Sequence, residues 1–162
     1  MLSKELIGIK WDQYWRSTTT PWIPHKLSID SQSCLEIGPG IEPTLSHTPP
    51  TIYDIMDVSK FAGHQSKFNY IWGLFPIDTS TRKYDTIILH DIFQETDLEF
   101  MELTLREIRD LLLPSGHVFI ETKAFNKKIA LRYFERSGSI RKRFMKQYII
   151  LKKKDQCANN LP

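Results

Sequence analysis

Apolar and polar positions alternate along this chain in a way that predicts strands and helices in turn. Short apolar runs bounded by glycine, proline or polar clusters are typical of buried strands. Such runs predict strands at 34–37, 51–56, 68–72, 84–89 and 117–122. Two further apolar runs, at 140–145 and 147–151, predict a closing hairpin.

The strongest helical pattern lies between the fourth and fifth predicted strands. Its apolar residues recur at steps of three and four and form one stripe: Leu98, Met101, Leu105, Ile108 and Leu112. Thr96 with Glu99 has the spacing of a capping box, and Pro114-Ser115-Gly116 is expected to end the helix.

Two weaker helices complete the pattern. One follows Pro43 and is expected to reach about His47. The other is predicted over 127–136 and is stopped by Gly138. Strands that alternate with helices predict an α/β fold with a mostly parallel central sheet and a C-terminal antiparallel hairpin.

The chain divides into three segments by this pattern. Residues 1–30 are aromatic and rich in turn formers, and we expect a helical and irregular segment. Within it, Trp11, Tyr14 and Trp15 are expected either to cover a bound ligand as a lid and contact substrate, or to pack on the sheet. Residues 31–154 form the main domain, and 155–162 a flexible tail.

Composition narrows the class of protein. Hydrophobic residues make up 41% and charged residues 25%, which is typical of a globular domain. No apolar run approaches about 18 residues, and the N-terminus lacks a signal-peptide pattern, so we expect a cytoplasmic protein without a membrane span. Cys34 and Cys157 lie far apart, and no Cys/His spacing fits a metal site.

Charge is distributed unevenly. Residues 123–154 hold twelve basic residues and one acid, Glu135, for a net charge of +11, whereas the rest of the chain carries −8. This asymmetry predicts an anionic partner for the basic region, either RNA or another anion, with Lys123 and Arg132 as candidate contacts. A solvated charged face is the alternative.

Candidate site residues follow the predicted strands directly. Ligands of open α/β sheets bind outside the carboxyl ends of the strands. The residues there are Gly38, Pro39 and Gly40, Asp57, Trp72 and Gly73, His90 and Asp91, and residues 121–123. Glycines let a backbone approach a ligand closely. The third position of a dinucleotide fingerprint is Pro43, and no Gly-Lys-Ser/Thr occurs, so neither a dinucleotide fingerprint nor a P-loop is present.

The segment CLEIGPG, with Glu36 two residues before Gly38, resembles the first motif of class I S-adenosylmethionine (SAM)-dependent methyltransferases. Two later blocks, KYDTIILHDIFQE and LREIRDLLLPSGHVFIET, are similar to the fourth-strand and fifth-strand blocks of the same family. The resemblance implies a Rossmann-like methyltransferase fold with SAM as cofactor.

By this resemblance, Glu36 contacts the methionine part of SAM beside the glycine segment, and an acid after the second strand takes the ribose hydroxyls. Asp57 is the first choice for that acid and Asp54 the second. The third strand lacks the usual adenine-contacting Asp, so Trp72 or Leu74 is expected to pack on the adenine.

The implied activity is methyl transfer to an unidentified acceptor, which the basic region suggests is an anionic small molecule. His90 and Asp91 are candidates for a catalytic base, and His90 also for a cofactor contact; a helix cap is the alternative role of Asp91. Two rival hypotheses remain: a non-catalytic binding module with this fold, and an RNA methyltransferase that uses the basic region.

Overall fold

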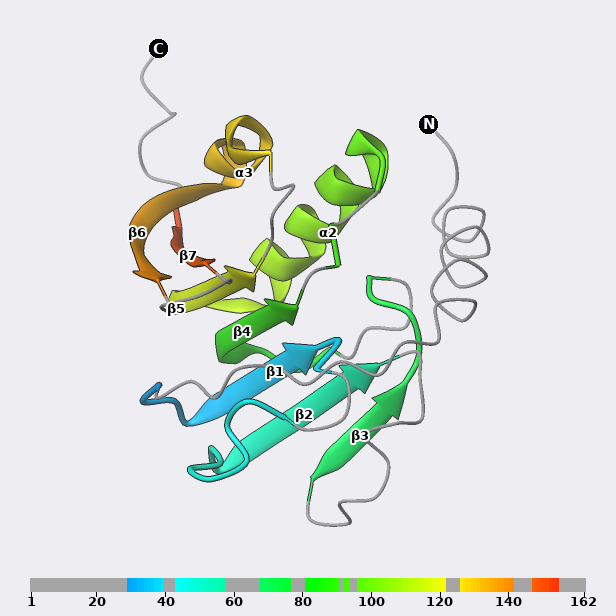
Figure 1. The fold of residues 1–162 in the computed structure, drawn as a ribbon, viewed down its shortest axis with the longest axis vertical. Helices are drawn as coiled ribbons and strands as arrows, with labels where there is room; N and C mark the ends of the chain where they lie inside the picture. The colour runs from blue at the N-terminus through cyan, green and yellow to red at the C-terminus, as the bar shows by residue number, and fades with distance from the viewer. Residues whose placement is uncertain are drawn as a thin grey trace.

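The computed structural model describes residues 29–39, 43–57, 68–76, 81–90, 92–93, 96–121, 126–141 and 147–154. Within these ranges the chain forms one seven-stranded sheet with two helices (Figure 1). The strands are β1 (Ser33–Ile37), β2 (Ile52–Asp57), β3 (Asn69–Trp72), β4 (Tyr84–His90), β5 (Leu112–Glu121), β6 (Phe134–Arg141) and β7 (Gln147–Lys153). The helices are α2 (Leu98–Leu111) and α3 (Lys127–Tyr133).

The sheet is parallel from β3 to β5 and antiparallel at its other edge. Its order is β3-β2-β1-β4-β5-β7-β6, and β7 pairs antiparallel with both β5 and β6. The strand order reverses between β1 and β4, which is the point where ligands bind in open α/β sheets. The predicted fold class, a mostly parallel sheet closed by a hairpin, is confirmed.

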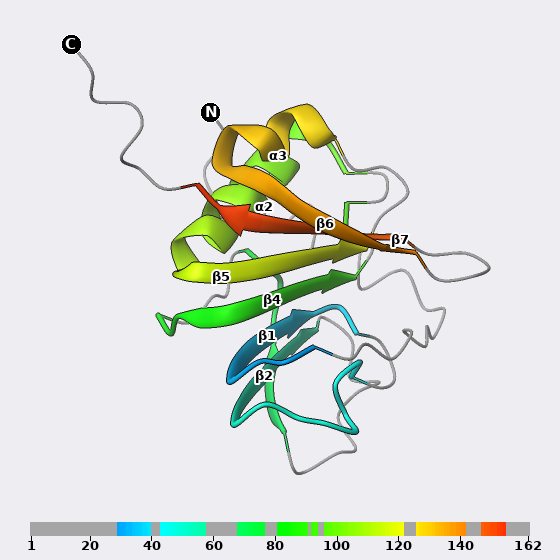
Figure 2. The ribbon, with the colours of Figure 1, turned by 90° about the vertical axis from the view of Figure 1, so that its left-hand side faces the viewer.

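Helices α2 and α3 pack on one face of the sheet (Figure 2). The buried side of α2, including Met101, Leu105 and Ile108, meets alternate residues of the strands such as Ile87 and Ile120. Three residues of the predicted apolar stripe, Met101, Leu105 and Ile108, therefore face the core, whereas Leu98 is 59% exposed and Leu112 belongs to β5. None of the helices in the described ranges has the length and apolarity needed to cross a bilayer.

The opposite face of the sheet carries a second buried cluster. Its members are the strand residues that alternate with the first set, together with Leu45 from a turn: Cys34, Tyr53, Ile55, Ile88, Phe119 and Tyr148. The same face also carries Glu36, His90 and Glu121. Glu36 is the register partner of Ile55 and Ile88, and Glu121 is the register partner of Tyr148 and of His90. Polar groups are thus buried on the side of the sheet away from α2.

The ends of α2 differ from the sequence prediction. The N-cap is Asp97, whose side chain accepts a hydrogen bond from the Phe100 N–H, whereas the Thr96 hydroxyl donates to the Phe93 carbonyl. The helix ends at Leu111, and Leu112 already pairs with Tyr84 as the start of β5. Strand pairing therefore stops the helix before Pro114.

The helix predicted over 127–136 ends at Tyr133, and its last part is the start of β6. Phe134 is fully buried and pairs with Lys153, and Gly138 lies inside the strand rather than after a helix. Burial of Phe134 and pairing with β7 outweigh the local helical pattern. Arg132 and Arg136 consequently do not share a helix face.

Gly116 occupies a position in β5 where no side chain fits. A Cβ atom there would lie 2.8 Å from the Leu112 side chain and 2.9 Å from the backbone oxygen of Asp85, beside the register shift between β4 and β5. The glycine that was predicted to end a helix instead permits close packing of two strands.

We predict that Gly116→Ala lowers the free energy of unfolding by about 1–3 kcal/mol, because the backbone of β4 must move to admit the methyl group. Gly138→Ala is the matched control, since its Cβ would lie 3.5 Å from the Ile150 side chain in ordinary contact. Chemical denaturation of both variants checks this. Equal stability of the two variants contradicts the close approach seen at Gly116.

Candidate functional site

The turn after β1 places the half-buried Gly38 at the carboxyl edge of the sheet. Gly38 has φ +70°, a left-handed conformation that favours glycine. Its N–H donates to the Met56 carbonyl at 2.8 Å, so the turn lies directly beside the end of β2. A Cβ at this position would lie 3.3 Å from the His90 carbonyl oxygen. The Gly38 turn therefore needs both the conformation and the small size of glycine.

Asp57 and Trp72 lie next to each other at the same edge. They are register partners at the ends of β2 and β3, and Gly73 donates its N–H to the Asp57 carbonyl at 3.2 Å. Asp57 is buried, whereas Trp72 is 42% exposed and stacks on Tyr70 with ring centroids 5.5 Å apart. This arrangement sets a carboxylate beside an exposed aromatic face, close to the Gly38 turn.

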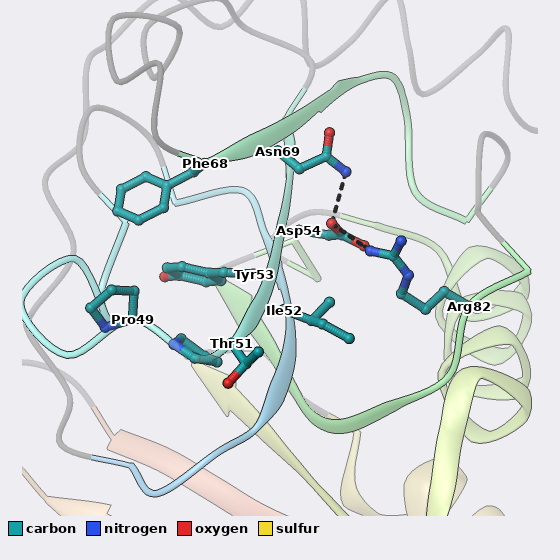
Figure 3. A pocket seen from close by; sticks show the side chains of 9 residues that line it. Pro49, Thr51, Ile52, Tyr53, Asp54, Phe68, Asn69 and Arg82 are labelled. Carbon is teal, nitrogen blue, oxygen red and sulfur yellow. Dashed lines mark hydrogen bonds and ion pairs between the residues drawn. The ribbon is translucent and has the colours of Figure 1, made fainter.

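Asp54 lies away from this group. It pairs with Asn69 at the start of β3, and its carboxylate accepts hydrogen bonds from the side chains of Asn69 and Arg82 (Figure 3) and from the Tyr84 hydroxyl. Asp54, Asn69 and Arg82 border a hollow of about 370 Å³ at the amino ends of β2 and β3. The structure therefore separates the two candidate acids for the ribose and brings only Asp57 to the carboxyl edge.

Glu36 is fully buried, and its carboxylate is surrounded by donors from the protein. It accepts the Thr44 N–H at 3.0 and 3.1 Å, the Thr44 hydroxyl at 2.8 Å and the Tyr53 hydroxyl. The His90 Nε2 lies 2.6 Å from one of its oxygens. Four donor groups fill the acceptor sites of a carboxylate. Residues 44–47 form a turn rather than the predicted helix, and Glu36 anchors it.

His90 lies between two carboxylates. Its Nε2 faces Glu36, and its Nδ1 lies 3.1 Å from Glu121, which also accepts the Tyr148 hydroxyl at 3.1 Å. The side chains of His90 and Glu36 are 0% exposed and that of Glu121 is 3% exposed. In this arrangement the His90 side chain makes no direct contact with solvent, and its ring nitrogens contact Glu36 and Glu121.

The surroundings of His90 favour its charged form. Burial alone would lower the pKa of His90, but the hydrogen bonds to Glu121 and Glu36 and the charges of these carboxylates hold it above its ordinary value. Burial and the adjacent carboxylates raise the pKa of the Tyr53 and Tyr148 hydroxyls, which therefore remain donors at neutral pH.

Several predicted site residues lie outside the described residues: Gly40, Asp91, Trp11, Tyr14, Trp15 and Lys123. Pro39 is buried beside the Gly38 turn, and Arg132 lies on α3 with Glu102 at 3.5 Å. The sequence prediction missed Thr44, Tyr53 and Tyr148. Tyr53 lies one residue before Asp54 in a predicted strand, and its alternation with Ile55 is the signal that could have found it.

No protein-family model and no curated protein sequence matches the chain. Solved structures do match its fold. The N-methyltransferase NodS from Bradyrhizobium japonicum WM9 matches with a TM-score of 0.66 and 11% identity, over 77% of this chain and 87% of NodS. NodS has also been crystallised with S-adenosyl-L-homocysteine (SAH).

Two other solved structures show the same architecture. A TehB-like SAM-dependent methyltransferase from Corynebacterium glutamicum matches with a TM-score of 0.60 and 14% identity, over 93% of this chain and 100% of that one. TrmN from Thermus thermophilus matches with a TM-score of 0.56 and 16% identity, over 75% of this chain and 44% of TrmN. The chain has the fold of class I SAM-dependent methyltransferases.

Proposed function

We propose that this protein binds SAM at the carboxyl edge of β1, β2 and β3 and transfers its methyl group to an acceptor. The observation that carries the proposal is the Gly38 turn: a glycine in the left-handed region whose N–H donates to the carbonyl of Met56, the residue before Asp57. It lies at the point where the strand order reverses, within a fold that known methyltransferases share.

The residues at this edge have the chemistry that SAM requires. The backbone at Gly38 offers close approach, the Asp57 carboxylate can accept from both hydroxyls of a ribose, and the exposed Trp72 ring can pack against an adenine. Glu36 differs from the expectation, because its acceptor sites already serve Thr44, Tyr53 and His90. Its direct contact with the methionine part stays a prediction.

SAM supplies an electrophilic methyl group on a positively charged sulfur. The protein then has to bind the cofactor, exclude water and align the acceptor, and alignment alone supplies much of the rate. A base is needed only for an acceptor that arrives protonated. His90 makes no contact with solvent in this arrangement, so any role in proton transfer would pass through Glu36 or Glu121. Asp91 remains a candidate base from the sequence alone.

The acceptor is most simply an anionic small molecule, because the chain is basic around α3, β6 and β7. A non-catalytic module that binds SAM is the competing hypothesis, and the burial of His90 favours it. Transfer of labelled methyl from SAM to a small-molecule extract separates the two: a non-catalytic module binds SAM but labels nothing.

An RNA acceptor is the second candidate function. Exposed cations from three elements adjoin one another, because Lys154 donates its backbone N–H to the Tyr133 carbonyl and β6 pairs with β7. We call this group the basic surface: Lys127, Lys128, Arg132, Arg136 and Lys154. Lys152 is the register partner of Glu135 and lies on the other face of the sheet. Among the described residues, Arg132 lies 3.5 Å from Glu102, and the Lys154 Nζ donates to the Leu131 carbonyl. The rest are available for phosphate groups.

We predict that the wild-type protein binds SAM and SAH, and that Gly38→Val abolishes this binding. The variant must hold a β-branched side chain in the left-handed region and beside the His90 carbonyl, at a stability cost of about 1–2 kcal/mol. Calorimetry measures the binding, and circular dichroism confirms that the variant is folded. Folded wild-type protein that binds neither compound would overturn the proposed function.

We predict that Asp57→Ala weakens SAM binding about tenfold or more, because a charged acceptor of two hydroxyls contributes roughly 1.5–3 kcal/mol. Asp54→Ala is the control, since Asp54 lies at the opposite ends of the strands and should leave the dissociation constant unchanged in the folded fraction. The reverse result, in which Asp54→Ala weakens SAM binding and Asp57→Ala does not, contradicts the placement of the ribose beside Asp57.

We predict that the basic surface binds short RNA with an affinity that falls steeply with salt, because phosphate contacts release counterions. Arg136→Glu should weaken binding severalfold and reduce the salt slope. Lys83→Glu removes the same charge at the start of β4 and should change little. Filter binding at several salt concentrations checks both variants. If RNA binding is weak and Arg136→Glu leaves it unchanged, the basic surface is a solvated face and RNA is not the acceptor.

A further inference from the structure

A continuous chain of hydrogen bonds crosses the carboxyl edge of the sheet and ends at the turn beside the glycine segment. It runs from Tyr148 on β7 to Glu121 on β5, His90 on β4 and Glu36 on β1, and then to Thr44 in the turn. The sequence separates its two ends by about a hundred residues. We call these five residues the edge network.

Proton count fixes the charge of the edge network. Each ring nitrogen of His90 faces a carboxylate oxygen, so each contact needs a proton between two groups that would otherwise both present lone pairs. Two protons shared among two carboxyl groups and one imidazole leave a net charge of −1, whichever atom holds them. A buried charge of this kind persists only where hydrogen bonds compensate it, and Thr44, Tyr53 and Tyr148 provide them.

Glu36 fixes the turn at two successive backbone groups. It accepts the Thr44 N–H directly, and it accepts the Tyr53 hydroxyl, which in turn accepts the Leu45 N–H at 3.1 Å. Both N–H groups belong to the turn that follows the glycine segment. The orientation of Glu36 depends on His90, and the orientation of His90 depends on Glu121 and Tyr148.

We propose that Glu121 and Tyr148 are positioning residues of the cofactor site, which act through His90 on Glu36. Glu36 in turn holds the 44–47 turn and lies two residues before Gly38, where the backbone approaches SAM. The inference rests on the proposed function. Glu36 thereby acts as the anchor of the turn, because its carboxylate accepts hydrogen bonds from groups of the protein. Neither Glu121 nor Tyr148 touches the cofactor in this scheme.

The edge network also makes cofactor affinity depend on pH. The groups that face His90 are Glu36 from β1, Glu121 from β5 and the Tyr148 hydroxyl from β7 at 3.4 Å from Nδ1. Loss of a proton from the network leaves one carboxylate facing a ring lone pair, and the anchor of the turn loosens. The pKa of His90 is raised above its ordinary value. The affinity for SAM is therefore highest at a pH below the ordinary pKa of histidine, and it falls as the pH rises through the raised pKa of His90.

The first experiment compares SAM dissociation constants by calorimetry at neutral pH. We expect Glu121→Gln and Tyr148→Phe each to weaken binding by about three- to thirtyfold, the range of coupling carried through neighbouring side chains. Tyr84→Phe is the matched control: Tyr84 is also a fully buried tyrosine that donates to a buried carboxylate, Asp54, but at the amino end of the sheet. It should lower stability without changing affinity.

The second experiment follows the SAM dissociation constant across pH. We expect the wild type to show a midpoint above the ordinary pKa of histidine. Glu121→Gln should move this midpoint to lower pH, because it removes a carboxylate that raises the pKa of His90. Tyr84→Phe should leave the midpoint in place. A purely structural role of Glu121 would lower the melting temperature and leave the midpoint unmoved.

The outcomes separate the two proposals. A wild type that binds SAM, with unchanged affinity and midpoint in both Glu121→Gln and Tyr148→Phe, overturns the inference and leaves the proposed function intact. A folded wild type that binds no SAM overturns both. Weakened binding in the two variants together with a shifted midpoint in Glu121→Gln, and neither effect in Tyr84→Phe, supports the inference.

Discussion

The hydrogen bonds of His90 to Glu36 and Glu121 are the interactions on which the carboxyl edge of this sheet depends. Two buried carboxylates on β1 and β5, the strands on either side of β4, would repel each other and lose their hydration. The imidazole between them neutralises part of that charge and joins β1, β4 and β5 through side chains as well as through the backbone. Removal of one partner leaves a buried charge without compensation, which costs more than the pair contributes.

The two ends of the sheet bury carboxylates in a similar way but with different consequences. At the amino end, Asp54 holds Asn69, Arg82 and Tyr84, and Asp85 accepts the backbone N–H groups of Gln32 and Ser33 at 2.9 Å each. These contacts fix where strands begin. At the carboxyl end, Glu36 instead holds the turn at Thr44 and lies two residues before Gly38, so the same chemistry shapes the edge at which we propose that SAM binds.

The hairpin of β6 and β7 connects the edge network to the basic surface. Tyr148 on β7 donates to Glu121, and the same strand leads to Lys154, whose Nζ donates to the Leu131 carbonyl on α3. Helix α3 is short because Phe134 leaves it to pair with β7. As a result the cations of 127–154 spread over a helix, a strand and a strand end, instead of following one helix face.

The sequence by itself determined the order and type of the elements, because hydrophobic period and turn residues are local properties. Runs such as 84–89 could only be buried strands, and the GPG segment after 34–37 marked the turn at the edge. The sequence also placed Asp57, Trp72 and His90 at strand ends, since the carboxyl ends of parallel strands share one edge.

Tertiary structure alone decided how far each element runs and which polar groups meet. Helix α2 stops at Leu111, and α3 stops at Tyr133, because strand pairing and burial of the next residues stabilise the fold more than another turn of helix would. Tyr148 reaches Glu121 only because β7 returns antiparallel beside β5. Such contacts depend on register between distant segments, and no local pattern encodes that register. The sequence therefore could not show that the Glu36 carboxylate meets Thr44 and His90.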